Sequence, residues 1–266
     1  MAQSSSLSRE WNSSEYHRLS APQVSWGKKV LARLHLRGDE LLLDAGCGTG
    51  RLTAELLQSL PAGHCVALDV SLNMLRSARQ HLQPEFGARA FLVAADLQDI
   101  PFENAFDGVV STAAFHWLLD HDRLFRGLYR TLRSGGWLQA QCGGGQNIAR
   151  VRERMTKLAA SPTFAPFLQK FPSPWLFQNA EGAADGLRRA GFAEVQTSLE
   201  AAPVVMENRR QYIEFMRTVI VRAHLDRLPG PDLQDQYVAQ LADQAAGDDP
   251  PFLLDYWRLN LSARKP

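Results

Sequence analysis

Short apolar runs alternate with amphipathic stretches through the first half of the chain. Each run ends in an acidic or small residue, and the stretch after it repeats apolar positions at helical spacing. Helices are therefore predicted at residues 51–60, after Ser71 and after Asp120, where the Ser and Asp side chains can cap the first turn. Strand–helix units in succession favour right-handed crossovers and a parallel sheet. The apolar runs predict strands at residues 41–45, 65–69, 91–95, 106–113 and 137–142.

The second half of the chain is less regular. Residues 162–177 combine five aromatic side chains with four prolines. This composition predicts an irregular lid or pocket wall, or else an aromatic cover that contacts no ligand. Two more strands are predicted at residues 192–199 and 254–263. Further helices are predicted at residues 25–36, 148–159, 179–190, 207–228 and 232–246.

Composition narrows the possible partners and environment. The chain has 266 residues, a formal net charge of +1 and no block rich in lysine or arginine, so nothing indicates nucleic-acid binding. Cys47, Cys65 and Cys142 are scattered, which fits reduced thiols better than disulfides or a metal site. The N-terminal residues are polar, unlike a signal peptide, and no apolar run approaches the roughly 20 residues that span a bilayer. We therefore expect one large α/β domain with insertions, cytoplasmic, with no membrane partner and no metal.

The segment between the first strand and its helix carries the first candidate chemistry. Asp44 ends the apolar run, and Gly46, Gly48 and Gly50 alternate with small residues before the helix begins. Glycines at such a turn let the backbone approach a ligand without a Cβ clash. The spacing differs from the Gly-x-Gly-x-x-Gly fingerprint of dinucleotide-binding proteins. Taken alone, the segment could also be an ordinary strand-to-helix loop.

Two further acidic residues follow neighbouring strands. Asp69 lies 19 residues after Gly50, close to the separation of about 20 residues at which a ribose-binding carboxylate follows a glycine turn. Asp69 could instead cap the next helix, a role that Ser71 can also fill. Asp96 follows the third strand and either binds a ligand or only ends the strand. Since ligands bind at the carboxyl ends of strands in such sheets, the acidic residues and the loop predict a nucleoside site.

Several of these motifs resemble those of class I S-adenosylmethionine-dependent methyltransferases, in the methyltransferase type 11 and trans-aconitate-methyltransferase-like branch. The resemblance covers roughly residues 11–192 and implies a Rossmann-like, doubly wound, mostly parallel α/β sheet. It further implies seven strands, an antiparallel edge strand and a helical cap. The similar segments are the acidic residue and glycine turn at 44–50, the stretch 95–102, the Phe-Asp-x-Val pattern at 106–109 and the Gly-Gly turn at 132–138, where Ser134 replaces a proline.

The resemblance also implies a site for S-adenosylmethionine, with S-adenosylhomocysteine as the product and no metal. In the family, the first acidic residue and the loop amides hold the amino-acid end, and the third acidic residue accepts from the adenine amino group. Met74 would pack against the adenine ring or else belong to the core. The residues assigned to the cofactor in this way are Tyr16, Asp44, Gly46, Cys47, Gly48, Gly50, Asp69, Val70, Met74, Asp96, Leu97 and Thr112.

The acceptor site is predicted beyond the fourth strand, at the carboxyl edge of the sheet. His116 follows this strand and is the candidate catalytic base for an acceptor that must lose a proton, or a hydrogen-bond donor to a bound carboxylate. A rim histidine that contacts no substrate is the alternative. His17 is a weaker candidate, and His121 is expected to face solvent. The predicted substrate-binding residues are Trp26, His116, Trp117, Gly143 and Phe177.

The predicted activity is methyl transfer to a small organic acceptor, at a carboxylate or hydroxyl oxygen. A carrier-protein or protein-carboxyl methyltransferase and a non-catalytic cofactor-binding protein remain alternatives, and the oligomeric state is open. The predicted segments are an N-terminal arm and lid helix at 1–36, the S-adenosylmethionine-binding core at 37–145, a lid insertion at 146–178, a core continuation at 179–206, a helical cap insertion at 207–250 and a final core strand at 251–266.

Overall fold

The computed structural model describes residues 21–266, with side chains described from residue 25 onward. The predictions for Tyr16 and His17 lie outside the described residues. The lid and cap roles predicted for residues 146–178 and 207–250 stay predictions. The chain divides into two compact units: the first contains the described residues up to Gly145 with Trp175–Glu200 and Arg258–Pro266, and the second contains Gln146–Pro174 and Ala201–Trp257.

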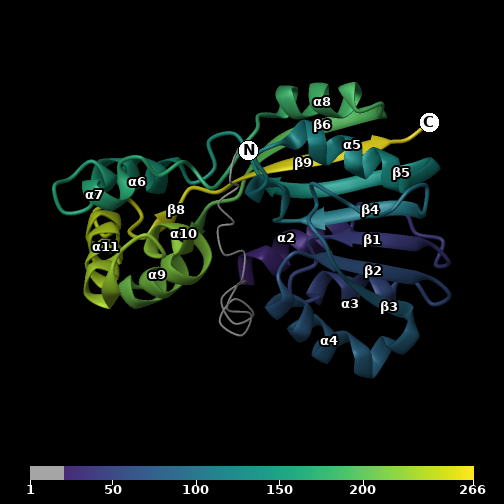
Figure 1. The fold of residues 1–266 in the computed structure, drawn as a ribbon, viewed down its shortest axis with the longest axis horizontal. Helices are drawn as coiled ribbons and strands as arrows, with labels where there is room; N and C mark the ends of the chain where they lie inside the picture. The colour runs from purple at the N-terminus through teal and green to yellow at the C-terminus, as the bar shows by residue number, and fades with distance from the viewer. Residues whose placement is uncertain (1–20) are drawn as a thin grey trace, which may run out of the picture. The chain divides into compact units, whose positions relative to one another are not determined.

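A seven-stranded sheet forms the centre of the first unit (Figure 1). Its strand order is β3-β2-β1-β4-β5-β9-β6, and the neighbours from β3 to β5 are all parallel. The predicted mostly parallel, doubly wound sheet is therefore confirmed. The strands are β1 (Leu41–Ala45), β2 (His64–Asp69), β3 (Ala90–Ala94), β4 (Phe106–Thr112), β5 (Leu132–Gly143), β6 (Ala193–Ala201) and β9 (Trp257–Arg264).

The antiparallel strand of the sheet is β9, which pairs with β5 (Figure 1). Its position differs in one detail from the expected edge. β9 enters between β5 and β6 and leaves β6 outermost. Leu259 and Leu261 are buried on one face of β9, and Arg258 and Asn260 are buried on the other. This agrees with the interior position, because an interior strand of such a sheet has both of its faces covered.

Helices bury an apolar cluster on each face of the sheet. Leu42 and Leu82 belong to one cluster, whereas Leu43 and Phe125 belong to the other. Neighbouring residues of a strand thus point to opposite layers, as the period of two requires. The first cluster lies under α2 (Ala21–Leu31), α3 (Arg51–Gln58) and α4 (Leu72–Phe86), and the second under α5 (His121–Thr131) and α8 (Ala180–Arg189).

Several element boundaries differ from the sequence predictions, among them the start of β5 and the end of α2. β5 begins at Leu132 rather than at residue 137, because Leu132 already pairs with Phe106 in the ladder. The Gly-Gly turn predicted there lies within the strand, where the amide of Lys265 donates to the carbonyl of Gly136 at 2.8 Å. α2 ends at Leu31, before the predicted end at residue 36.

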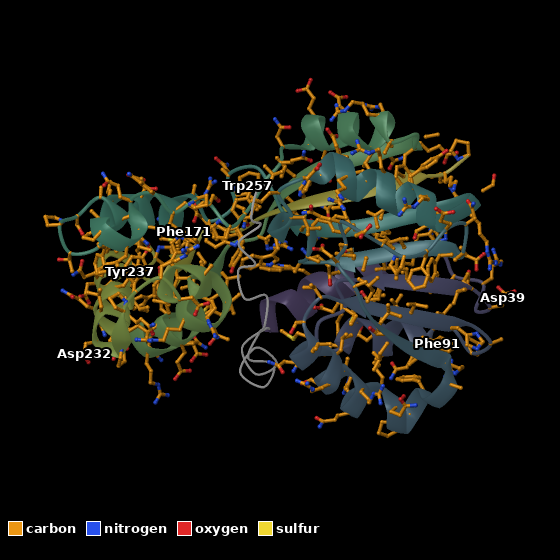
Figure 2. The ribbon with its side chains drawn as sticks, viewed as in Figure 1. Asp39, Phe91, Phe171, Asp232, Tyr237 and Trp257 are labelled. Atoms are coloured by element: carbon orange, nitrogen blue, oxygen red, sulfur yellow. The ribbon has the colours of Figure 1, made fainter. Side chains whose placement is uncertain are left out.

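The second unit is mainly helical. Phe164 and Tyr237, both fully buried, meet edge to face in its core with ring centroids 5.1 Å apart; Figure 2 labels Tyr237 on the last helix. None of the helices of residues 21–266 has both the length and the apolar character needed to cross a membrane. The elements of this unit are α6 (Ala149–Ala159), α7 (Ala165–Leu168), α9 (Arg209–Phe215), the π-helix η3 (Met216–Ile220), α10 (Arg222–Leu225), α11 (Gly230–Ala245) and the antiparallel pair β7 (Val204–Val205) and β8 (Leu253–Leu254).

Candidate active site

The loop between β1 and α3 places three glycines in left-handed backbone conformations. The angle φ is +84° at Gly46, +55° at Gly48 and +79° at Gly50, where other residues would be strained. A Cβ at Gly46 would lie 2.4 Å from the Cβ of Ala114, and one at Gly50 would lie 2.9 Å from Leu82 Cδ1. A Cβ at Gly48 would meet no atom of the described residues within 4 Å. The outer two glycines thus allow close packing inside the protein, whereas Gly48 leaves its backbone accessible to a ligand.

Asp69 connects this loop to the start of α4. Its Oδ2 accepts a 2.9 Å hydrogen bond from the amide of Gly48, and its Oδ1 accepts one of 2.9 Å from the amide of Ser71. The Ser71 hydroxyl accepts from the amide of Met74 at 3.2 Å and thereby caps α4. The cap that the sequence left open between Asp69 and Ser71 therefore belongs to Ser71. Each carboxylate oxygen can accept more than one hydrogen bond, so these contacts are compatible with ligand binding.

Asp44 is a carboxylate buried between β1 and α3, with 1% of its surface exposed. Its Oδ2 accepts a 2.6 Å hydrogen bond from the hydroxyl of Thr53. Burial raises the pKa of Asp44 from 3.8 to about 7, the hydrogen bond from Thr53 opposes the shift, and the negative charge of Asp69 adds to it. A cation that arrived nearby would favour the ionised carboxylate.

The carboxyl ends of three strands meet at this edge of the sheet. The Leu68 carbonyl on β2 accepts from the amides of Gly46 at 2.8 Å and Cys47 at 3.0 Å, which lie just after β1. The Asp69 carbonyl accepts from the amide of Ala95, just after β3, at 3.1 Å. The structure therefore brings the glycine loop, Asp69 and the start of the segment that carries Asp96 to one edge.

Asp96 lies two residues beyond β3 and is half-buried. Its Oδ1 accepts a 2.9 Å hydrogen bond from the amide of Gln98, so the carboxylate folds over the turn that follows it. The other residues predicted for the cofactor differ in exposure. Cys47, Met74 and Leu97 are buried, Thr112 is half-buried, and Val70 is 41% exposed.

His116 lies in the short turn η2 (Phe115–Trp117) after β4. Its Nδ1 accepts from the amide of Gly143 at 3.3 Å, and its carbonyl accepts from the amide of Leu176 at 2.9 Å. Because Nδ1 is an acceptor, the proton of the neutral ring resides on Nε2. Burial lowers the pKa of His116 well below 6.5, and the positive charge of Arg258 lowers it further. His116 is therefore a neutral imidazole whose Nε2–H can donate a hydrogen bond.

Aromatic rings pack against His116. Phe177 stacks on the imidazole with ring centroids 5.7 Å apart, and the Trp117 ring lies at 5.4 Å. Trp175 packs against Trp117 at 5.8 Å and against Phe177 at 5.9 Å. The structure thus brings three of the predicted substrate residues together. It adds Trp175, which the sequence marked only as part of an aromatic segment.

Arg258 on β9 was not predicted as a site residue. It is 2% exposed, and its Cα lies opposite that of Gly143 in the β5–β9 ladder. Its guanidinium carbon lies 4.2 Å from the centroid of the Trp26 ring. Trp26 and Gly143, both predicted to bind substrate, therefore border Arg258. A signal was present in the sequence, because Arg258, Asn260 and Ser262 alternate with apolar residues and give this buried strand one polar face.

The expectation that His121 faces solvent was wrong. His121 is 3% exposed, and its Nε2 lies 2.9 Å from the Phe115 carbonyl in a hydrogen bond. Asp120 caps α5, so His121 is the first residue of the helix and packs against η2. This contact supports the turn that carries His116.

The comparisons with known proteins agree on one family. Residues 43–140 match the family described as a methyltransferase domain. A trans-aconitate 2-methyltransferase of Deinococcus radiodurans is 30% identical over 250 residues, which cover 90% of this chain and 92% of the relative. A trans-aconitate 2-methyltransferase of an Azoarcus species is 29% identical over 253 residues, which cover 90% of this chain and 89% of the relative.

A solved structure supports the fold. Haemonchus contortus phosphoethanolamine N-methyltransferase 2, in complex with phosphomonomethylethanolamine and S-adenosylhomocysteine, matches with a TM-score of 0.62 and 19% identity. The match covers 96% of this chain, which spans 57% of that solved chain. The sequence relatives carry the family assignment: the chain belongs to the class I S-adenosylmethionine-dependent methyltransferases, in the group that contains the trans-aconitate 2-methyltransferases.

Proposed function

We propose that this methyltransferase acts on a carboxylate oxygen of a small organic acid. Because the chain belongs to this family, its methyl donor is S-adenosylmethionine. The acceptor is inferred from the state of His116 and from the chemistry of the rings around it.

The β1–α3 loop, Asp69 and Asp44 hold the cofactor in this proposal. The space beside Gly48 admits a ligand close to the backbone, and Asp69 is oriented by the amides of Gly48 and Ser71 so that it can also accept from ribose hydroxyls. Asp44 favours a cationic amino group, and Asp96 favours the amino group of adenine. When bound, S-adenosylmethionine supplies a methyl group on a sulfonium, and its transfer to a carboxylate oxygen releases no proton.

The state of His116 is the observation that favours a carboxylate acceptor. A general base needs a ring nitrogen that can take up a proton, but Nδ1 already accepts from Gly143, and Nε2 carries the proton. A carboxylate is ionised at neutral pH and needs no base, whereas a hydroxyl would benefit from one. His116 therefore acts as a donor that orients the acceptor oxygen, while Trp117 and Phe177 exclude water beside it.

The names of the sequence relatives agree with this acceptor class. Both are trans-aconitate 2-methyltransferases, and trans-aconitate is a carboxylate. At 29–30% identity the substrate itself can differ, so the proposal is limited to small organic acids.

Methyl-ester formation tests the proposal. The purified chain is incubated with methyl-labelled S-adenosylmethionine and a panel of carboxylic acids that includes trans-aconitate, with matched alcohols and amines. We expect a labelled product from one or more acids that releases labelled methanol in mild base, as esters do. Methylation of alcohols or amines alone, with no base-labile product from any acid, would overturn the proposal.

A further inference from the structure

The polar face of β5 and β9 contains a buried cation beside His116. Gly143 connects the two residues, since its amide donates to His116 Nδ1 at 3.3 Å and its Cα lies opposite that of Arg258. Residues opposite each other in a ladder project to the same face of the sheet. Because Gly143 has no side chain, none stands across the ladder from the Arg258 side chain.

Hydrogen bonds along this strand face orient the side-chain amide of Gln141, which accepts a hydrogen bond from Arg258. The Gln141 amide nitrogen donates to Asn260 Oδ1 at 2.7 Å, and Arg33 donates to the same oxygen at 2.7 Å. This arrangement leaves the oxygen end of the Gln141 amide directed to Arg258, whose Nε–H donates to it at 3.4 Å. The amide is thus fixed in the orientation that suits a cation.

One contact and one chemical property make this place suitable for a guanidinium rather than an ammonium. The guanidinium lies over the Trp26 ring, with its central carbon 4.2 Å from the ring centroid, a favourable cation–π geometry. A guanidinium is also planar and stays charged when buried, whereas a lysine ammonium readily loses its proton in such surroundings. The same positive charge is one cause of the lowered pKa of His116.

We propose that Arg258 binds a carboxylate of the methyl acceptor and selects anionic acceptors over neutral ones. The guanidinium fork matches a carboxylate in two parallel hydrogen bonds, which gives both affinity and orientation. His116 and Arg258 both lie next to Gly143, and the charge of Arg258 acts on the His116 ring. An acid bound at His116 can therefore place a carboxylate against the guanidinium of Arg258. This role rests on the proposed carboxylate methylation.

Discrimination between an acid and its neutral ester tests this role. The probes are trans-aconitate and its trimethyl ester, titrated into the full chain with saturating S-adenosylhomocysteine. We expect the wild-type chain to bind the acid at least tenfold more tightly than the ester. We expect Arg258→Gln to lose most of that preference, and Arg258→Lys to keep only part of it, because lysine retains a charge but not the fork.

Arg264→Gln is the matched control, since Arg264 lies on the same strand but is half exposed and pairs with Glu194. S-adenosylhomocysteine affinity and the melting temperature report whether Arg258→Gln still folds. A preference for the acid that is unchanged in folded Arg258→Gln, or equal binding of acid and ester by the wild-type chain, would overturn the role of Arg258. Failure to form methyl esters from any acid would instead overturn the proposed function, so the two results are distinct.

Discussion

The backbone amide of Gly48 donates a 2.9 Å hydrogen bond to Oδ2 of Asp69. The other oxygen of the same carboxylate accepts from the amide of Ser71, the cap of α4. One side chain at the end of β2 therefore fixes both the glycine loop after β1 and the start of the next helix. The loop and the carboxylate are coupled, so a change in either alters the geometry of the other.

Asp69→Ala is expected to weaken the binding of S-adenosylhomocysteine. The substitution removes a hydrogen-bond acceptor from the site and releases the amides of Gly48 and Ser71. Loss of such a partner costs about 1–3 kcal/mol, or roughly 5- to 150-fold in the dissociation constant. Isothermal titration calorimetry measures the change. Asp99→Ala is the control because Asp99 is exposed in the turn after β3. If the wild type, Asp69→Ala and Asp99→Ala bind S-adenosylhomocysteine with equal affinity, Asp69 does not contact the cofactor.

Gly48→Ala is expected to reduce cofactor affinity more than it reduces stability. A methyl group at this position meets no atom of the described residues within 4 Å, so it projects into the space that the ligand would use. The left-handed backbone adds strain of about 1–2 kcal/mol. Calorimetry gives the affinity, and urea unfolding gives the free energy of unfolding.

Gly230→Ala provides a control at another glycine with a positive φ. Its φ is +76°, it is exposed, and its Cβ would likewise meet no described atom within 4 Å. Both variants should therefore lose stability through the positive φ, and only Gly48→Ala should lose affinity. Equal affinity losses would mean that strain, rather than the approach of a ligand, limits residue 48.

The strand–helix half of the fold was predictable because its signals are local. The strands predicted at residues 41–45 and 65–69 end at Ala45 and Asp69 as expected, and Ser71 and Asp120 cap the helices expected to follow them. The position of β9 inside the edge was not predictable in the same way. Strand order depends on which strands pair across long distances in the sequence, and no local sequence pattern determines that pairing.

The predicted site shows the same division between local and long-range information. Gly46, Gly48 and Gly50 follow one another at a regular spacing, so they could be identified from the sequence. Arg258 lies 142 residues after His116, and only the β5–β9 ladder brings it to Gly143. His121 was misjudged for a related reason, because its burial depends on packing against η2 and not on the polarity of the helix start.

His116→Ala is expected to lower the turnover number more than it lowers cofactor affinity. The substitution removes the Nε2–H donor while leaving Asp69 and the glycine loop intact. Loss of a single donor to a charged oxygen corresponds to about 1.5–3 kcal/mol, or roughly 10- to 150-fold in kcat/KM. Because its pKa lies well below 6.5, His116 stays neutral above that pH. The wild-type kcat on a carboxylic acid should therefore show no histidine titration between about pH 6.5 and 8.5.

His35→Ala is the control for this measurement, since His35 is exposed. Steady-state rates with calorimetric affinities separate the two effects. A larger loss of cofactor affinity than of turnover would assign His116 to the cofactor. A kcat that rises with a pKa near 6.5 and loses this dependence in His116→Ala would show that it acts as a base.

Asp44→Asn is expected to change how stability depends on pH. The pKa of Asp44 is about 7 in the folded chain, whereas an exposed aspartate in the unfolded chain has a pKa near 3.8. Between these values the folded state holds a proton that the unfolded state has lost. Wild-type stability therefore falls as pH rises from about 4 to 7, by up to about 1.4 kcal/mol per pH unit from this group. Asp44→Asn cannot ionise and should gain stability relative to wild type over the same range.

Urea unfolding of both proteins from pH 5 to 8 gives this difference directly, because the other titrating groups are common to both. Asp39→Asn serves as the control, since Asp39 is exposed and lies outside the strand. If Asp44 also receives the cationic amino group of the cofactor, binding lowers its pKa and releases a proton near pH 7. Calorimetry in buffers of different ionisation enthalpy then detects that proton in the wild-type chain and not in Asp44→Asn. A stability difference that does not change with pH would mean that Asp44 is ionised throughout, and the burial argument for it would fail.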